Sequence, residues 1–412
     1  MLDINYIREN TEEVKKKVVT KNFDPKFIDE VVKLDEKRRK LIGEIEELRA
    51  ERNKAASDKD IEKGKGIKLK LQKLEPEFKE TEEKYKVALW KIPNLPSDDT
   101  PIGKDESENK VIRKWGEPRK FDFKIKDHVE LGKDLGIIDT DKAANVSGAR
   151  FNYLKGDLVL LQNALYQFAL EVLIKKGFIP IIPPLIVKAE VMKKMSRHDP
   201  IDDRYYLKED DSMLIGSAEH TLGPMHMNET FDEKNLPLRY FAFTPAFRRE
   251  AGTYGKDTRG ILRQHQFDKV EMESFTLAKQ GKEEQDFLVQ IQEHLMQELK
   301  LPYQVVSICT GDMGGPDYRQ IDIETWMPGQ NKYRETNTSD YVTDYQSRRL
   351  NTRVRSGSET EFVHMNDATA FAMGRTIIAI LENYQNEDGS VEIPKVLQKW
   401  MGKKKISKLV IS

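Results

Sequence analysis

Cysteine is almost absent from this sequence, in which Cys309 is the single thiol among 412 residues. One cysteine excludes an intrachain disulfide framework and a cysteine-based zinc cluster, so we expect Cys309 to pack as a small apolar residue in a strand. Long apolar runs are missing too: no segment approaches the roughly 18 residues that span a membrane. The opening MLDINYIREN contains no hydrophobic signal region. These shortages predict a soluble, cytoplasmic protein without a membrane partner.

The chain also has no excess of charge. Its 69 lysines and arginines balance 70 aspartates and glutamates, which leaves a formal net charge of −1. The chain as a whole is therefore not a basic nucleic-acid binder, and any such contact must come from a local patch. Neither common phosphate loop, G-x-G-x-x-G or G-x-x-x-x-G-K-[ST], occurs in the sequence. A nucleotide would need a different kind of site.

Residues 27–92 carry the apolar spacing of two long helices joined by a turn at residues 57–66. The spacing alternates between four and three residues, which predicts an antiparallel coiled-coil hairpin about 40 Å long. Arg38 interrupts the first stripe, Thr81 is a weak position in the second, and Pro76 should kink the returning helix or mark a restart. The apolar positions are Phe27, Val31, Leu34, Leu41, Ile45 and Leu48, then Ile67, Leu71, Leu74, Phe78, Tyr85 and Leu89.

The predicted tip of this hairpin is rich in lysine, notably Lys63, Lys65, Lys68 and Lys70. Lysines on an exposed helix usually form a solvated face. A rigid basic arm also fits a nucleic-acid backbone, whose phosphates and shape it could contact without reading bases. Both interpretations stay open from composition alone.

A proline-rich linker, IPNLPSDDTPIG at residues 92–103, separates the hairpin from a mixed α/β pattern. We therefore predict a domain at residues 1–103 and a second at residues 104–412. Residues 177–187 should form an edge or interface strand, because prolines interrupt them. Strands that follow one another through loops favour an antiparallel sheet and an α+β fold. Strand-like segments cover residues 240–247, 270–277, 303–310, 320–327 and 361–364, and helical spacing covers residues 158–175, 281–299 and 370–384.

Residues 247–267, FRREAGTYGKDTRGILRQHQF, combine basic side chains with glycines between two apolar flanks. Arginine offers a planar fork to two phosphate oxygens, and glycine lets the backbone approach a ligand closely. Glu250 can accept from an amine, and Phe267 can stack on a base. A solvated charged hairpin is the alternative, but the combination favours a nucleotide site. The basic residues and glycines are Arg248, Arg249, Lys256, Arg259, Arg263, Gly252, Gly255 and Gly260.

This segment is one of several specific segments that follow one another in a fixed order. They are MLDINYIREN, IPNLPSDDTPIGKDE, SAE at 217–219, FRREAGTYGKDTRGILRQHQFDKVE ending at Glu271, CTGDMG at 309–314, PGQNKYRE at 328–335 and AMGRTIIAILENYQNEDGSVEIPKVLQKWMG from Ala372. With these segments the chain resembles bacterial-type seryl-tRNA synthetases, a family of class II aminoacyl-tRNA synthetases, over nearly its whole length.

The resemblance implies a catalytic domain on a mainly antiparallel sheet flanked by helices, preceded by a helical tRNA-binding arm. It implies a homodimer formed through the segment around Pro183, with the tRNA bound across the two subunits. The reaction would join L-serine and ATP to seryl-adenylate, then transfer serine to tRNA(Ser). An enzyme that reads the long variable arm could also charge tRNA(Sec).

The resemblance also assigns roles on the ATP side. Arg248 and Arg375 would be the catalytic arginines, at the α-phosphate and the γ-phosphate. Glu250 would accept from the adenine amine, Phe267 would stack on the ring, and His265 would be structural. Mg²⁺ would lie on Glu335 and Thr338, since hard oxygen ligands suit it. ATP binding is assigned to Arg248, Arg249, Glu250, Arg263, Phe267, Glu335, Thr336, Asn337, Thr338 and Arg375.

Serine binding falls, by the same resemblance, on Ser217, Ala218, Glu219, Arg248, Glu271 and Thr369. A site that hydrogen-bonds a hydroxyl rejects alanine, because its own polar groups would be left unpaired. Three segments depart from the family pattern: SAEHTL at 217–222, ETNT at 335–338 and HMNDAT at 364–369. The hydroxyl positions remain, but Asp367 replaces the usual amide and would add a negative charge near the pocket.

Two alternatives compete with a serine–tRNA ligase. The first is a carrier-protein ligase with the same adenylating core, which usually lacks the coiled-coil arm. The second is a non-enzymatic relative, which should have lost phosphate-binding residues. The arm is predicted here, and Arg248, Glu250, Glu335 and Arg375 are all present, so the sequence favours the ligase.

Overall fold

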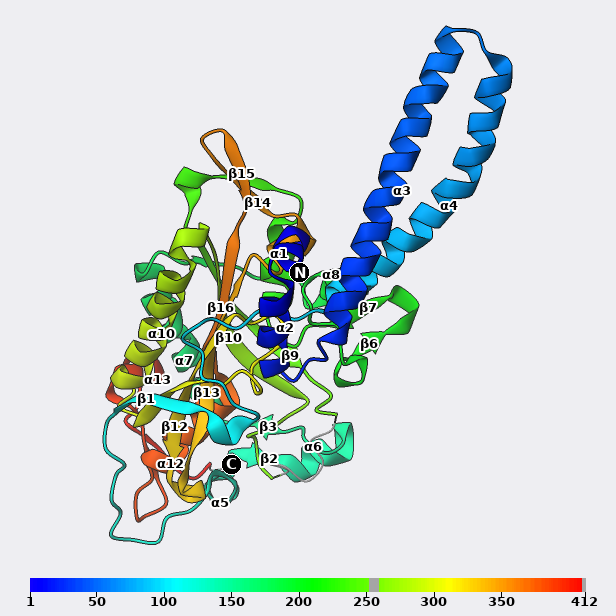
Figure 1. Ribbon diagram of the computed structural model, residues 1–412. Coiled ribbons are helices and arrows are strands. Elements are labelled where there is room, and N and C mark those ends of the chain that lie inside the picture. Colours follow the sequence, from blue (N-terminus) through cyan, green and yellow to red (C-terminus); the bar gives the residue numbers. More distant parts are fainter. Residues whose placement is uncertain (252–258, 410–412) are drawn as a thin grey trace.

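The computed structural model describes residues 1–251 and 259–409, which form a long helical hairpin projecting from a mixed α/β body (Figure 1). Gly252, Gly255 and Lys256 of the arginine–glycine segment therefore lie outside the described residues. The N-terminal helices are α1 (Ile4–Glu9), α2 (Thr11–Thr20), α3 (Lys26–Ser57) and α4 (Ile61–Lys91). The predicted antiparallel hairpin is confirmed, since α3 and α4 pack side by side along their length.

The turn at the hairpin tip is shorter than the sequence predicted. Only residues 58–60 separate α3 from α4, and Asp60 caps α4 by accepting from the backbone N–H of Lys63 at 3.0 Å. Gly64 and Gly66, which fall in the predicted turn at residues 57–66, lie inside the first turns of α4. That helix also continues through Pro76 without a restart, and the limb is bowed rather than broken (Figure 1).

A buried ion cluster explains the interruption of the heptad at Arg38. The Asp35 carboxylate is only 1% exposed and meets Arg8 at 3.0 Å, Arg39 at 3.2 Å and Arg38 at 3.5 Å. The Arg38 guanidinium also lies over the Tyr85 ring of α4, 4.8 Å from its centroid. The polar position is thus a specific contact between α1 and the two limbs.

One large sheet organises the body, with the strand order β1-β11-β12-β13-β16-β10-β9-β4. Every pair in it is antiparallel except β4 with β9. The predicted α+β fold on a mainly antiparallel sheet is confirmed. The strands are β1 (Lys110–Trp115), β4 (Ile179–Pro180), β9 (Leu238–Phe247), β10 (Gln266–Thr276), β11 (Tyr303–Ser307), β12 (Arg319–Met327), β13 (Lys332–Thr343) and β16 (His364–Ala372).

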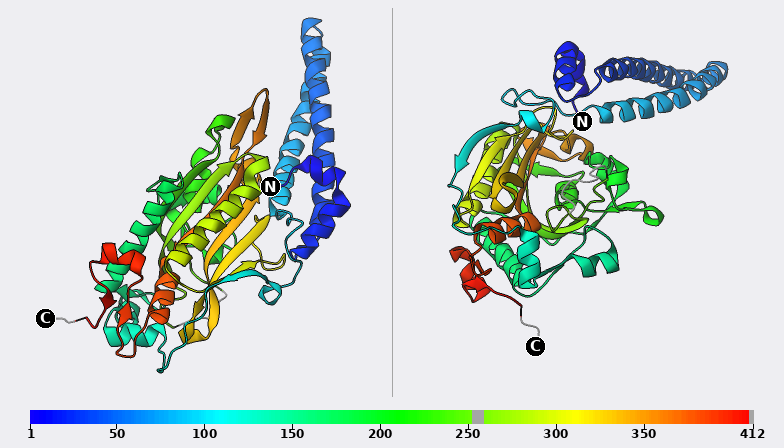
Figure 2. Two further views of the ribbon diagram at one scale, coloured as in Figure 1. Left: turned by 90° about the vertical axis from the view of Figure 1, so that its left-hand side faces the viewer. Right: turned by 90° about the horizontal axis from the view of Figure 1, so that it is seen from below.

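Three helices flank this sheet: α7 (Asp157–Lys175), α10 (Gly281–Glu298) and α12 (Met373–Asn383) (Figure 2). Their apolar side chains share one core with the strands. By length and composition alone α7 could cross a membrane. It packs instead against α12, α13 (Gln398–Met401), β4 and β16, so we interpret it as a core helix.

Shorter elements complete the described fold. The helices are α5 (His128–Leu135), α6 (Thr140–Ser147), α8 (Ala189–Lys194), α9 (Glu219–Leu222) and α11 (Ser347–Leu350). The small sheets join β2 (Ile138–Asp139) with β3 (Tyr153–Leu154), β5 (Ile186–Lys188) with β7 (Ser212–Leu214) and β6 (Tyr206–Leu207), β14 (Arg353–Ser356) with β15 (Glu359–Phe362) and β8 (Thr230–Asp232), and β17 (Val391–Glu392) with β18 (Lys405–Ile406).

Several predicted boundaries were wrong. The strand predicted at residues 361–364 ends β15 and begins β16, which continues to Ala372, so α12 starts three residues later than predicted. Of residues 177–187, Ile179 and Pro180 form the edge strand β4, as expected, whereas residues from Ile186 join another sheet. Cys309 is buried as predicted but follows β11 instead of lying in it.

The central strand β13 was missed because its sequence, KYRETNTSDYVT, looks like a polar loop. Its backbone is covered by two glutamine side chains of α10. Gln285 donates to the carbonyl of Ser339 at 2.9 Å, and Gln292 donates to the carbonyl of Thr338 at 2.8 Å. Polar covering side chains thus replace the apolar alternation that usually marks a buried strand.

Candidate functional site

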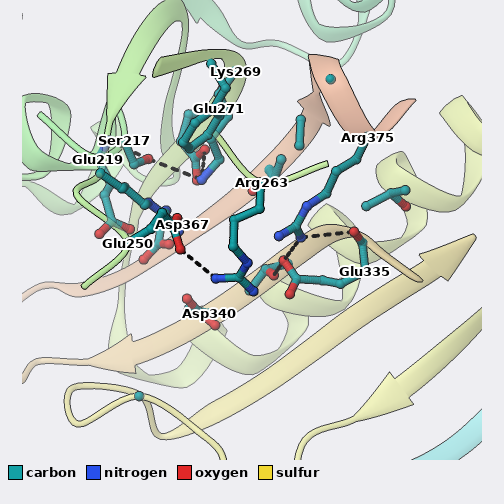
Figure 3. A pocket seen from close by; sticks show the side chains of 18 of the residues that line it. Ser217, Glu219, Glu250, Arg263, Lys269, Glu271, Glu335, Asp340, Asp367 and Arg375 are labelled. Atoms are coloured by element: carbon teal, nitrogen blue, oxygen red, sulfur yellow. Dashed lines mark hydrogen bonds and ion pairs between the residues drawn. The ribbon is translucent and has the colours of Figure 1, made fainter. Parts of the chain in front are cut away.

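A polar cavity of about 370 Å³ lies over the sheet, where β9, β10, β12, β13 and β16 meet the first turn of α12. Arginines and Phe267 line one part of it. Figure 3 shows Arg263 and Arg375 in this part and the carboxyl groups of Glu219, Glu271 and Asp367 in another. Most residues that the resemblance assigned are brought together here. Arg249, Ala218 and Asn337 do not line the cavity.

The cationic end contains two arginine–glutamate pairs. Arg375 donates to the Glu335 carboxylate at 2.7 Å and to its carbonyl oxygen at 3.0 Å. Arg263 donates to the Glu250 carboxylate at 2.6 Å (Figure 3). Each guanidinium is therefore aimed into the cavity by a carboxylate, and an incoming anion would compete for it.

Arg248 is fixed at the middle of the cavity. Its Nε donates to the carbonyl of Gly216 at 3.2 Å, and its guanidinium lies 5.4 Å from the Phe267 ring centroid. Its backbone N–H donates to the carbonyl of His265 at 3.0 Å, and the His265 Nδ1 lies 3.0 Å from the Arg248 carbonyl. These contacts of His265 agree with the structural role expected for it.

The three remaining assigned residues differ in what their side chains do. Arg249 is exposed, and its guanidinium lies 5.9 Å from the Tyr205 ring centroid. Ala218 is buried in an apolar cluster with Leu222 and Ala242. Asn337 donates to the carbonyl of Ala370 at 2.8 Å, so it joins β13 to β16 beneath the cavity.

Oxygen ligands gather beside Glu335. The Thr338 hydroxyl donates to the Glu335 carboxylate at 3.4 Å. Asp322 is buried next to both, and burial together with the nearby Glu335 raises its pKa well above its ordinary value. A cation would relieve the repulsion between these two carboxyl groups, so the donor set fits a hard divalent ion.

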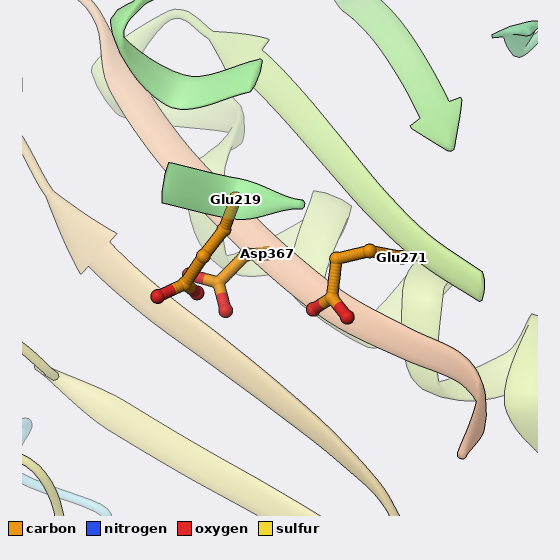
Figure 4. A group of neighbouring side chains, drawn as sticks. All are labelled: Glu219, Glu271 and Asp367. Atoms are coloured by element: carbon orange, nitrogen blue, oxygen red, sulfur yellow. The ribbon is translucent and has the colours of Figure 1, made fainter. Parts of the chain in front are cut away.

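Three carboxyl groups face one another at the acidic end: Glu219, Glu271 and Asp367 (Figure 4). One oxygen or more of each lies within 4.8 Å of the others. The Lys269 ammonium lies 2.5 Å from Glu271 and donates to the Ser217 hydroxyl at 3.3 Å. Thr369 is buried beside them on β16.

Arg197, which the sequence did not single out, is the main counter-charge of this acidic end. Its Nε lies 2.7 Å from Glu219, and its Nη2 lies 3.6 Å from Asp317, 3.8 Å from Asp340 and 3.9 Å from Asp367. A lone arginine in an irregular segment carries no pattern, so nothing in the sequence pointed to it.

The pKa values of Glu219 and Asp367 shift in opposite directions. Burial opposes ionisation of Glu219, but Arg197 together with the hydrogen bonds from His220 and Asp367 outweighs burial and keeps the pKa of Glu219 well below its ordinary value. Burial, then the charges of Glu219 and Asp340, raises the pKa of Asp367 well above its ordinary value, which favours a protonated carboxyl hydrogen-bonded to Glu219. This shift works against the extra negative charge expected at Asp367, and a protonated carboxyl at this position donates as the usual amide would.

His220 supports the same arrangement. Its Nδ1 accepts from the backbone N–H of Gly216 at 3.0 Å, and its Nε2 lies 3.3 Å from Glu219. Burial lowers the pKa of His220 to about 4, so the ring is neutral near pH 7. It orients Glu219 without adding a charge.

A second positioning pair lies under the cationic end. His128, the first residue of α5, places its Nδ1 3.1 Å from the buried Glu382 of α12, which also accepts from Gly329. The His128 Nε2 accepts from the backbone N–H of Ile261 at 3.3 Å. Gly260 leaves room for this contact, since a Cβ there would lie 2.0 Å from the same nitrogen. The pair fixes the backbone that leads to Arg263.

The arm lysines lie apart from the cavity. Lys63, Lys65, Lys68 and Lys70 are exposed in the first turns of α4, at the far end of the hairpin (Figure 1). Contacts that they make with a partner would therefore be separate from the chemistry in the cavity.

Comparison with known proteins gives a consistent result. The seryl-tRNA synthetase N-terminal domain profile matches residues 1–96, and that of the tRNA synthetase class II core domain (G, H, P, S and T) matches residues 203–384. The serine–tRNA ligase of Petrotoga mobilis is 42% identical over 420 residues, covering 98% of this chain and 99% of the relative.

Solved structures agree along the whole chain. Seryl-tRNA synthetase from Pyrococcus horikoshii complexed with ATP is 41% identical, has a TM-score of 0.95, and both chains are covered in full. The cytoplasmic serine–tRNA ligase of Naegleria fowleri in complex with AMP is 33% identical, with a TM-score of 0.92 over 100% of this chain and 99% of that one.

The raised pKa of Asp367 leads to a stability prediction. The unfolded chain releases this proton near pH 3.8, whereas the folded chain releases it only at higher pH, so the aspartate lowers the free energy of unfolding increasingly as the pH rises above 3.8. Asp367→Asn should raise the thermal midpoint by a few °C at pH 7, and the gain should vanish below about pH 4.

The control is Asp210→Asn, because Asp210 is exposed. Circular dichroism melts between pH 4 and pH 8 measure both variants. A gain for Asp367→Asn that is the same at both ends of this range would show that the carboxyl is ionised in the folded protein.

Proposed function

The chain belongs to the seryl-tRNA synthetase family of class II aminoacyl-tRNA synthetases, and from this premise we propose how its cavity performs the reaction. The chain is a serine–tRNA ligase: it activates L-serine with ATP and transfers the seryl group to tRNA(Ser). The observation that supports the assignment of residues is the division of one cavity into an arginine-lined end and a carboxylate-lined end. The first fits a triphosphate, and the second fits an ammonium group.

ATP occupies the arginine-lined end. Arg248 contacts the α-phosphate and Arg375 the γ-phosphate, while the adenine lies against Phe267 and donates its amine to Glu250. The serine carboxylate attacks the α-phosphorus in line, and pyrophosphate leaves with the bonding electron pair. Negative charge grows on the phosphorus oxygens in this step, so the fixed Arg248 stabilises the transition state more than bound ATP.

Serine occupies the carboxylate-lined end. Glu219, Glu271, Asp317, Asp340 and Asp367 outnumber the cations near them, which are Arg197, Lys269 and, behind Asp317 and Asp340, Lys21. The substrate ammonium supplies positive charge that this cluster lacks, and the Ser217 and Thr369 hydroxyls lie within the same pocket. In the second step the terminal adenosine hydroxyl of the tRNA attacks the seryl carbonyl, and AMP leaves.

A magnesium ion fits the oxygen donors of Glu335 and Thr338, with Asp322 beside them. When bound, Mg²⁺ neutralises charge on the triphosphate. Thr336, which lines the cavity, and Asn337 beneath it hold β13 in place for these donors.

The N-terminal unit (residues 1–103) binds the tRNA, and residues 104–412 form the catalytic domain. Lys63, Lys65, Lys68 and Lys70 contact the tRNA backbone, and tRNA(Sec) is a second acceptor for the same arm. In the segment that runs from β4 to β5, the isoleucines Ile179, Ile182 and Ile186 are 46%, 99% and 53% exposed. This exposed apolar segment supports a homodimer in which tRNA bound by one subunit's arm reaches the other subunit's cavity. The cytoplasm is the proposed location.

The first test is ATP–pyrophosphate exchange with each of the twenty amino acids. Serine should support rapid exchange, because the pocket offers hydroxyl partners and an acidic end for the ammonium group. Arg248→Ala should slow this exchange, because the transition state loses roughly 3 kcal/mol of stabilisation. Exchange with alanine or glycine but not with serine would refute the proposed specificity. Charging of tRNA by the same preparation separates the two functions, because a carrier-protein ligase would not charge tRNA.

The arm lysines should act on tRNA alone. Replacing Lys63, Lys65, Lys68 and Lys70 with glutamate reverses four exposed charges and should weaken tRNA charging by at least about 100-fold, while serine-dependent exchange stays intact. The control replaces the exposed body residues Lys120, Lys124, Lys300 and Lys395 with glutamate, which makes the same change in net charge. Equal losses from the two sets would show that the effect is non-specific.

His128 should act on ATP binding through Ile261. Asparagine can keep the contact with Glu382 but loses the acceptor for the Ile261 N–H, whereas glutamine can place an acceptor near the lost Nε2. We expect His128→Asn to raise KM for ATP by roughly tenfold and His128→Gln to restore most of it, with KM for serine unchanged. Identical values for the two variants would mean that the ring only fills space.

A further inference from the structure

The N-terminal unit places one lysine directly behind the acidic end of the cavity. Lys21 ends α2, and its ammonium donates to three backbone carbonyls: Gly314 at 2.7 Å, Asp317 at 2.9 Å and Gly315 at 3.1 Å. Three carbonyls use all three protons of one ammonium group. The side chain crosses from the tRNA-binding unit into the catalytic domain to make these bonds.

Neighbouring residues of the same unit hold the rest of this loop, which we call the 311–318 loop. Asn22 donates to the carbonyl of Gly311 at 3.3 Å. Asn94 donates from its backbone to Gly315 and from its side chain to Pro316, both at 2.9 Å. The loop's carbonyls therefore face the N-terminal unit along much of its length.

The other side of the loop faces the cavity. Gly314 and Asp317 line it, and the Asp317 carboxylate lies 3.6 Å from Arg197. Space is tight at this point, because a Cβ on Gly314 would lie 2.2 Å from the Asp317 carboxylate. A small movement of the loop backbone would displace Asp317, and Arg197 would lose one of the groups that hold it on Glu219.

We propose that Lys21 is a positioning residue for the serine pocket: it holds the 311–318 loop so that Asp317 and Arg197 keep Glu219 in place for the substrate. This rests on the proposed serine site. The contact is direct from Lys21 to the backbone, from Asp317 to Arg197, and from Arg197 to Glu219. The amino-acid pocket is therefore completed by a side chain from the unit that binds tRNA.

The ammonium group of Lys21 is buried away from solvent. This burial indicates a structural contact and not an incidental one at the surface. Burial lowers its pKa to about 8, opposed by Asp317 and Asp340. The titratable and charged groups that face it are these two carboxylates and Arg197. Above pH 8 the amine becomes neutral and retains two protons for three carbonyls, so the grip on the loop weakens.

The test compares Lys21→Met with Lys17→Met. Lys17 lies one turn earlier on α2, and its ammonium pairs with the Asp98 carboxylate at 2.9 Å instead of donating to a loop carbonyl. In ATP–pyrophosphate exchange, Lys21→Met should raise KM for serine by roughly tenfold and leave KM for ATP within about twofold. Lys17→Met should match the unchanged protein in both. An unchanged KM for serine, or equal increases in both KM values, would overturn the proposal.

Two further measurements keep the test decisive if Lys21→Met folds poorly. Gly314→Ala displaces Asp317 with Lys21 intact and should reproduce the rise in KM for serine. Lys21→Arg keeps its charge at high pH, so the ratio of its KM for serine to that of the unchanged protein should fall between pH 7.5 and 9.5. A constant ratio together with a normal Gly314→Ala variant contradicts the proposal. Failure of the unchanged protein to exchange with serine would instead refute the proposed function.

Discussion

The acidic end of the cavity depends above all on the buried guanidinium of Arg197. Carboxylates cannot stay ionised in a desolvated place unless an opposite charge or a proton compensates them. Arg197 lies 2.7 Å from Glu219 and favours its ionised form, whereas burial and the charges of Glu219 and Asp340 raise the pKa of Asp367. The pocket therefore combines a carboxylate that attracts an ammonium group with a carboxyl whose protonated form can donate a hydrogen bond. Arg197 lies near both groups, at 2.7 Å and 3.9 Å.

The cationic end follows a related rule. Arg375 and Arg263 lie against Glu335 and Glu250, so each guanidinium has a partner before a triphosphate arrives. Binding of the triphosphate then exchanges one charge-assisted contact for another. It costs little side-chain entropy, because both arginines are already ordered. Arg248 differs, because backbone carbonyls and an aromatic ring hold it. In these contacts no carboxylate pairs directly with the Arg248 guanidinium. This suits a group that contacts the phosphate at which negative charge develops.

Sequence reasoning succeeded where information was local. The heptads predicted α3 and α4, and the continuous segment around Arg248 contains two arginines, one glutamate and one aromatic residue that do meet in the cavity. It failed where tertiary contacts decide. The strand β13 is polar because glutamines of α10 cover it, and nothing in its own sequence reports that cover. Arg197, Lys21 and His128 are isolated residues whose partners are more than twenty positions away, so no spacing could reveal their roles.

The buried carboxylate in the arm's base has a mechanical consequence. Asp35 accepts from α1 and from its own helix, while Arg38 lies on Tyr85 of the opposite limb. A buried polar position of this kind fixes the register of paired helices, because sliding one helix along the other would leave the buried carboxylate without its arginine partners. A slip of one heptad would shift the limb by about 10 Å, roughly the width of a nucleic-acid groove. Asp35, near the base of the hairpin, thus fixes where the tip of the hairpin lies, several helical turns away.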